Sequence, residues 1–163
     1  MEHTTEHKLS VLARVARTLN EHELSWAMAS SVVLYFNGVA EEFHDLDIMV
    51  DEAHFDAAAE ALAALGEQHQ PVLLPDKYAT KRFTKFTVDG VEIDLMGGFA
   101  IVRGGAVYHF PMTPDTVERT VQVQGQAVPL QWLELWRRCY ELMGRAARVE
   151  SIDRFLEERR GHS

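Results

Sequence analysis

The stretch Asp45-Leu46-Asp47-Ile48-Met49-Val50 alternates two carboxylates with apolar residues and ends in an apolar run. This pattern predicts a buried strand over residues 45–50. Because successive side chains of a strand point to opposite faces, Asp45 and Asp47 would project from the same face, about 7 Å apart, while their apolar neighbours point into the core. Two like charges on a mostly buried strand repel each other and are costly to desolvate. A divalent cation such as Mg²⁺, which prefers carboxylate ligands, would remove that penalty.

A second acidic pair lies in another apolar stretch, Val91-Glu92-Ile93-Asp94-Leu95-Met96. Strands over 83–88 and 91–96 flank Asp89-Gly90, which is a strong hairpin signal. Glu92 and Asp94 would therefore share one face of a strand. Acidic residues are depleted in strands, so two such pairs in one small domain favour a functional cluster over two solvated edge strands.

Upstream, Trp26-Ala27-Met28-Ala29 continues into Ser30-Ser31. The pattern predicts a strand over 24–29 and a helix over 32–36 that ends at Asn37-Gly38. The start of such a helix attracts anions, because its backbone N–H groups are free and its dipole is positive there. The Ser30 hydroxyl is expected either to cap the helix or to contact a phosphate.

The rest of the chain predicts one α+β domain over residues 1–163, with a mixed β-sheet flanked by helices and a helical C-terminus. Its core would span about 24–130 and its C-terminal helices about 131–160. The remaining expected helices are 6–21, 53–65, 132–143 and 149–158, and the remaining expected strands are 71–74, 99–102, 107–110, 117–123 and 127–130.

Composition narrows the class of protein. The chain has 163 residues, with 16 Lys and Arg against 25 Asp and Glu, a formal net charge of −9. General nucleic-acid binding is disfavoured, because that affinity comes mostly from basic groups on phosphates. The single cysteine, Cys139, excludes an internal disulfide and a cysteine-based zinc cluster. No apolar run approaches the roughly 18 residues of a membrane span, and residues 1–8 are polar, which predicts a cytoplasmic protein without membrane contact.

Two basic regions stand out in this acidic chain. Residues 76–85 hold four cations against one acid, and such a segment is either a solvated loop or a binding site for a compact anion such as a nucleotide. The C-terminal helices also have a basic side, but neighbouring acids favour a balanced, solvated face there. The cations of the first region are Lys77, Lys81, Arg82 and Lys85; those of the second are Arg137, Arg138, Arg145, Arg148 and Arg154.

Taken in chain order, these features resemble the polymerase-beta-like nucleotidyltransferase superfamily, and within it the small bacterial minimal and antibiotic nucleotidyltransferases. The family's two glycines fall on Ser30 and Ser31. Its paired aspartates fall on Asp45 and Asp47, and its third acid falls on Asp94. The resemblance covers about residues 24–95.

The resemblance implies an enzyme that moves a nucleoside monophosphate from a nucleoside triphosphate to a hydroxyl of a small-molecule or protein acceptor. In the family, two Mg²⁺ ions about 3.5–4 Å apart stabilise the entering and leaving oxygens. Asp45 and Asp47 would be shared metal ligands, and Asp94 would bind the second ion and help to deprotonate the acceptor. Glu92 is a less favoured substitute for Asp94.

The nucleotide would be bound by Ser30 and Ser31 and by cations of the basic segment: Lys77, Lys81, Arg82 and Lys85. His44, next to Asp45, either reaches an acceptor or lies at the surface. The family pair usually begins with glycine, so Ser30 would hold a triphosphate farther from the backbone. This departure leaves a second hypothesis open: a catalytically weak or inactive protein of the same fold that serves as a binding or regulatory partner, as in a toxin–antitoxin-like pair.

Overall fold

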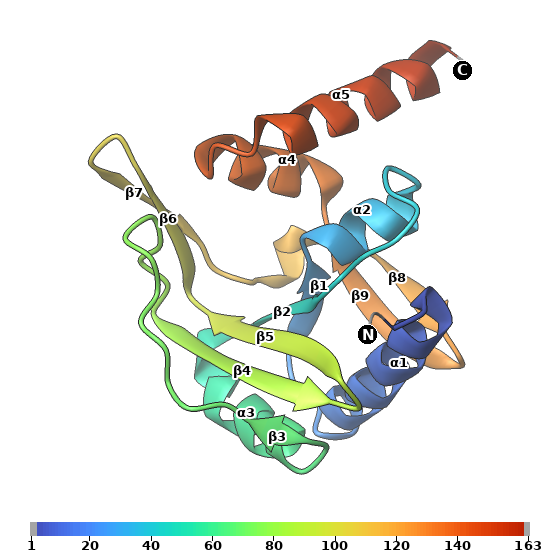
Figure 1. Ribbon diagram of the computed structural model, residues 1–163, viewed down its shortest axis with the longest axis vertical. Coiled ribbons are helices and arrows are strands. Elements are labelled where there is room, and N and C mark those ends of the chain that lie inside the picture. Colours follow the sequence, from blue (N-terminus) through green and yellow to red (C-terminus); the bar gives the residue numbers. More distant parts are fainter. Residues whose placement is uncertain (1–2, 162–163) are drawn as a thin grey trace.

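The computed structural model describes residues 3–161 and contains one large and one small β-sheet (Figure 1). The seven-stranded mixed sheet has the order β3-β4-β5-β2-β1-β9-β8, and β6 and β7 form a separate two-stranded sheet. The strands are β1 (Trp26–Ala29), β2 (Leu46–Val50), β3 (Glu67–Gln68), β4 (Arg82–Val88), β5 (Val91–Gly97), β6 (Phe99–Arg103), β7 (Ala106–Phe110), β8 (Val117–Val123) and β9 (Gln126–Gln131).

The helices flank the large sheet, and two of them close the chain. They are α1 (Thr5–Glu21), α2 (Ser31–Asn37), α3 (Phe55–Ala63), α4 (Leu133–Leu142) and α5 (Ala146–Gly161), with 3-10 turns η1 (Glu52–His54) and η2 (Pro114–Thr116). The expected α+β class, mixed sheet and helical C-terminus are thus confirmed. Within residues 3–161, no helix combines the length and the apolar character that crossing a bilayer requires.

The alternation along β2 separates two hydrophobic clusters on opposite faces of the sheet. Leu46, Ile48 and Val50 pack with α1 and α3, whereas Met49 packs with α2 and α4. Figure 1 shows α4 and α5 at one end of the molecule, away from α1 and α3. Because strand side chains repeat every two residues, Asp47 lies on the same face as Met49, toward α4.

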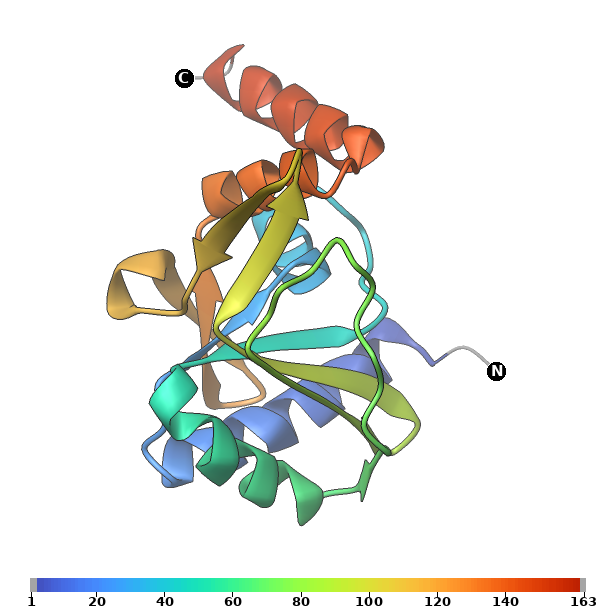
Figure 2. The same ribbon diagram turned by 90° about the vertical axis from the view of Figure 1, so that its left-hand side faces the viewer.

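The expected strand over 71–74 is wrong. These residues have no regular structure, and Leu73 is 99% exposed. Pro71 and Pro75 bracket the stretch, and proline removes the N–H that a strand ladder needs. The connection instead crosses toward the small sheet, where Tyr78 forms a bridge with Ile101 of β6 (Figure 2).

Strand register brings the acidic positions together. In the parallel pair β2–β5, Asp47 lies opposite Asp94. On the far side of β2, Ala29 at the end of β1 lies opposite Asp47, and on the far side of β5, Lys85 lies opposite Asp94. One row across four neighbouring strands therefore reads Ala29, Asp47, Asp94 and Lys85.

Candidate active site

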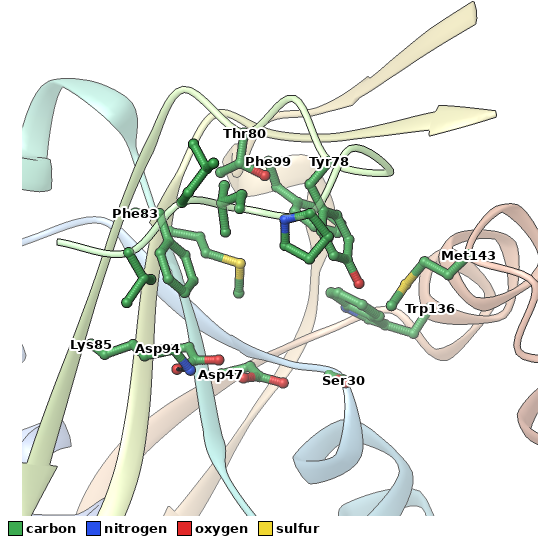
Figure 3. Close-up of a pocket in the computed structure, with 15 residues that line it drawn as sticks. Ser30, Asp47, Tyr78, Thr80, Phe83, Lys85, Asp94, Phe99, Trp136 and Met143 are labelled. Atoms are coloured by element: carbon green, nitrogen blue, oxygen red, sulfur yellow. Dashed lines mark hydrogen bonds and ion pairs between the residues drawn. The ribbon is translucent and has the colours of Figure 1, made fainter. Parts of the chain in front are cut away.

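Asp47 and Asp94 lie side by side at the floor of a cavity of about 360 Å³ (Figure 3). Paired positions on adjacent strands are about 4.8 Å apart, and these two side chains leave the sheet on the same face. Ser30, the residue after β1, also lines the cavity. The periodicity of two strands and their parallel register together produce this carboxylate pair.

Lys85 supplies the one cation that lines this cavity among the described residues. Its Nζ donates a hydrogen bond of 3.0 Å to Asp94 Oδ1. Although burial alone would lower the pKa of Lys85, the hydrogen bond to Asp94 and the attraction of nearby carboxylates raise it. This contact has a sequence signal that we missed: a two-residue loop at Asp89-Gly90 pairs Val88 with Val91, and counting back along both strands pairs Lys85 with Asp94.

Among the carboxylates of the site, Asp47 has the most strongly raised pKa. Burial, followed by repulsion from Asp94 and Asp45, raises the pKa of Asp47 to about 7, and a hydrogen bond from Ser30 only partly opposes this. The pKa of Asp45 is also raised, mainly by burial and by Asp94. The floor therefore holds more negative charge than Lys85 neutralises, and a bound cation would relieve it.

Asp45 does not share this cavity. It lies at a bend just before β2, which begins at Leu46, so the expectation of a strand that includes Asp45 is wrong by one residue. Its side chain lines a smaller cavity of about 160 Å³, together with His44 and Glu92. Asp45 still acts electrostatically on Asp47, so it lies at the edge of the site.

Ser30 has the backbone conformation expected of the glycine that it replaces. Its φ of 58° and ψ of −129° are readily adopted by glycine and are strained for a residue with a Cβ. Ser30 does precede α2, but its hydroxyl makes no capping hydrogen bond. That hydroxyl instead shares a hydrogen bond of 2.7 Å with the Tyr140 hydroxyl. Ser31 is the buried first residue of α2.

Tyr140 of α4 therefore belongs to the site as well as to the core, where its i, i+4 spacing with Trp136 places both rings on the buried face of the helix. Its hydroxyl contacts Ser30, which in turn bonds to Asp47. Burial raises the pKa of Tyr140, so the phenol remains protonated at neutral pH and available for this contact. The sequence contained no signal for it, because Ser30 and Tyr140 are 110 residues apart.

The walls of the large cavity are apolar and aromatic. In Figure 3, Phe83 stands on one side of the carboxylates, and Tyr78 extends toward Trp136 on the other. The Trp136 ring is stacked on Phe99, with ring centres 5.7 Å apart. The rim is the irregular stretch 72–75, whose side chains line the opening. A ligand would thus have a charged floor beneath it and aromatic surfaces around it.

The four cations of the basic segment are engaged by neighbours. Only Lys85 among them lines the cavity. The contacts are Lys77 with the Tyr78 ring (5.3 Å from Nζ to the ring centre), Lys81 with Glu52 (3.6 Å), Arg82 with Asp56, and Lys85 with Asp94 (3.0 Å).

The carboxylates do not form a complete protein cage for an ion. Over residues 3–161, no group of three or more His, Cys, Asp or Glu side chains is arranged to hold a metal. Asp47 and Asp94 nevertheless fit Mg²⁺, which is commonly bound through one or two carboxylates together with substrate phosphates and water. Such a pair suits an ion that binds together with a phosphorylated ligand.

No protein-family model and no curated protein matches this chain in sequence. Solved structures do match it over nearly its full length. A candidate nucleotidyltransferase from Thermotoga maritima is 22% identical, with a TM-score of 0.73 over 96% of this chain and 97% of the other. The lincosamide antibiotic adenylyltransferase LnuA, solved with lincomycin bound, is 11% identical, with a TM-score of 0.59 over 94% of this chain and 98% of the other.

The antibiotic-resistance factor ANT(2″)-Ia, solved in complex with adenylyl-2″-tobramycin, is 10% identical, with a TM-score of 0.54 over 93% of this chain and 98% of the other. These similarities extend over the sheet, the flanking helices and the helical C-terminus. The chain has the fold of the small bacterial nucleotidyltransferases.

Proposed function

We propose that this protein is a Mg²⁺-dependent nucleotidyltransferase that moves a nucleoside monophosphate from a nucleoside triphosphate to a hydroxyl of a small molecule. The observation that carries this proposal is the register of β2 and β5, which places Asp47 beside Asp94 on the floor of a cavity in a chain with this fold. The excess negative charge there supports a role in binding a cation and its phosphates.

In this proposal Asp47 and Asp94 hold Mg²⁺ together with the phosphates, and Asp45 contributes from the edge of the site. Mg²⁺ held by these residues would neutralise charge and would stabilise the attacking and leaving oxygens. Asp94 accepts the proton of the acceptor hydroxyl, and the hydrogen bond from Lys85 fixes the orientation of the Asp94 carboxylate. Ser30, held by Tyr140, orients Asp47.

The cavity walls favour an acceptor with an apolar body. Phe83, Phe99 and Trp136 offer ring surfaces for stacking, and the carboxylates that line this cavity are confined to its floor. A strongly cationic acceptor would instead need acidic groups on the walls. We therefore propose a neutral or weakly charged small molecule whose hydroxyl reaches the floor while its apolar part contacts the rings.

Pyrophosphate release tests this function directly. The purified protein is incubated with Mg²⁺, each of the four nucleoside triphosphates in turn, and a panel of hydroxylated apolar compounds. We expect acceptor-dependent pyrophosphate release that Asp47→Asn and Asp94→Asn abolish, while the exposed control Asp115→Asn keeps it. Failure of the wild-type protein to bind any triphosphate in the presence of Mg²⁺ would contradict the proposal.

Two observations favour a second candidate, a protein of this fold that binds a nucleotide without efficient transfer. Lys85 lies beside Asp94 and partly neutralises a carboxylate that the first candidate function assigns to Mg²⁺ binding. Ser30 places a side chain where glycine would let phosphates approach the backbone. Nucleotide binding that requires Mg²⁺, with no pyrophosphate release for any acceptor, would select this candidate.

A further inference from the structure

Two arginines near the start of α5 have no acidic partner in the part of the chain that the structure describes. Three other arginines of the C-terminal helices form ion pairs: Arg137 with Asp153, Arg138 with Glu141 and Arg154 with Glu150. Arg159, near the far end of α5, lies over the Phe155 ring. Arg145 and Arg148 form neither an ion pair nor a side-chain hydrogen bond within residues 3–161. The expectation of a balanced face is therefore wrong for these two.

The helix break explains why Arg145 is left unpaired. Its nearest acid along α4 is Glu141, which already contacts Arg137 and Arg138. At Gly144 the chain takes a φ of 76°, a left-handed conformation that ends α4 before Arg145. Arg145 and Arg148 consequently lie at the start of a new helix, whose acids Glu150 and Asp153 pair with other arginines.

Both guanidinium groups lie on the Tyr140 ring. The central guanidinium carbons of Arg145 and Arg148 are 5.7 Å and 5.4 Å from the ring centre. The hydroxyl of that same ring contacts Ser30, next to Asp47. Tyr78 lines the cavity, and burial raises the pKa of its phenol. The charge of Arg145 lowers this pKa and the charge of Asp47 raises it, so both groups act on the same side chain. The arginines thus lie behind Tyr140, beside the end of α4 where Met143 lines the cavity.

This charge separation restricts what can neutralise the site. The floor carries excess negative charge from its carboxylates, and the two arginines beside the end of α4 have no acidic partner among residues 3–161. A ligand that satisfies both presents a cation at the floor and an anion toward the end of α4, as Mg²⁺-polyphosphate does. Arginine forms bidentate contacts with phosphate, whereas three of the four cations of the basic segment, Lys81, Arg82 and Lys85, are already paired with carboxylates.

We propose that Arg145 and Arg148 bind the distal phosphates of the nucleoside triphosphate. This inference rests on the proposed function, because it assumes that the ligand is a triphosphate, and it assigns the phosphates to the C-terminal helices rather than to the basic segment. The competing explanation is structural: the arginines only brace Tyr140 by stacking on its ring.

Calorimetry with inorganic tripolyphosphate and with ATP, each in the presence of Mg²⁺, tests the assignment. We expect Arg145→Ala and Arg148→Ala each to weaken tripolyphosphate binding about 10-fold to 100-fold, the usual range for a lost charge-assisted hydrogen bond. The matched control is Arg154→Ala, which removes an exposed arginine of the same helix and should leave binding within about twofold.

Thermal melts of the same variants separate binding from bracing. Arg145 is exposed, so its loss should shift the melting temperature by less than about 2 °C if its role is binding. A bracing role would instead lower the melting temperature and leave tripolyphosphate affinity unchanged, which would overturn the inference. The double variant combines Arg145→Ala with Arg148→Ala. If it unfolds, Arg145→Gln alone still removes one proposed phosphate ligand at an exposed position.

The outcomes distinguish this inference from the proposed function. Wild-type affinity for tripolyphosphate in the double variant overturns the inference alone. Absence of binding of both tripolyphosphate and ATP to the wild-type protein overturns the inference and the proposed function together. Arginine-dependent tripolyphosphate binding without pyrophosphate release in the transfer assay supports the inference and contradicts the proposed function.

Discussion

Replacing Asp47 by asparagine removes one negative charge from the floor of the cavity and keeps the shape of the side chain. In the metal-free protein, burial and two neighbouring carboxylates raise the pKa of Asp47 from 3.8 to about 7. Because its folded-state pKa exceeds its unfolded value, the group stabilises the fold fully below about pH 3.8, and this contribution is lost as the pH rises through about 7. At pH 8 the ionised Asp47 therefore opposes folding.

The two pKa values set the size of the effect. The difference between about 7 and 3.8 is about 3 pH units, which corresponds to at most about 4 kcal/mol at 1.36 kcal/mol per unit. Asp47 titrates together with Asp45 and Asp94, so neutralising it also relaxes them and the gain is shared. We expect Asp47→Asn to raise the free energy of unfolding at pH 8 by about 2 kcal/mol, or roughly 4–8 °C in melting temperature.

Urea and thermal denaturation in EDTA at pH 4, 6 and 8 measure this change. The stability gain should be near zero at pH 4 and largest at pH 8. Asp115→Asn, at an exposed position in η2, is the matched control and should show no such pH dependence. With excess Mg²⁺ and ATP the order should reverse, because the wild-type protein gains binding energy that the variant lacks.

A loss of stability in the metal-free variant would refute this reasoning. If Asp47 is held by hydrogen bonds for a structural purpose, asparagine should cost about 1–3 kcal/mol at pH 8. That result, combined with no response of either protein to Mg²⁺ and ATP, would remove the catalytic interpretation of the carboxylate pair.

Three further predictions concern the residues around this pair. Ser30→Gly should be more stable than Ser30→Ala by about 1–3 kcal/mol in urea denaturation, because only glycine relieves the strain of a positive φ; equal stability would contradict the strained conformation. Mg²⁺ without nucleotide should leave the melting temperature within about 1 °C, because the cavity offers two carboxylates and no complete cage; a large shift would indicate a preformed metal centre. The Cys139 thiol is buried and burial raises its pKa to about 12, so a thiol reagent at pH 8 should modify it only after denaturation.

The sequence predicted the floor of the cavity well because the floor depends on local periodicity. Alternation predicts that Asp47 projects from β2 on the face opposite to Leu46 and Ile48, and the Asp89-Gly90 turn fixes which residue of β4 meets Asp94. The error in the prediction of the floor also has a local cause. Asp45 had the right spacing, but the strand begins one residue later, so its side chain turns to the smaller cavity.

The walls and rim depend on contacts between distant segments, which no local pattern encodes. The apolar run 71–74 has strand-like composition, yet its prolines and the lack of a partner strand leave it at the opening of the cavity. Tyr140 has the helical spacing of a residue that packs in the core. Its hydroxyl has a role only because the fold brings Ser30, 110 residues away in the sequence, beside it.

The difference between the floor and the walls of the cavity also indicates which residues determine the preference for an acceptor. The carboxylates lie on paired central strands, where a one-residue shift would move both side chains to the opposite face, so their positions are tightly constrained. Most residues that would contact an acceptor lie outside the large sheet, in the irregular stretch 72–75, in and beside β6 (Phe99, Tyr78) and in α4 (Trp136). Phe83 is the exception, because it lies in β4 and pairs with Met96 of β5. Substitutions in these segments can alter the shape of the cavity without moving Asp47 or Asp94. We therefore expect acceptor preference to vary independently of nucleotide chemistry on this fold, with the aromatic walls as the variable part.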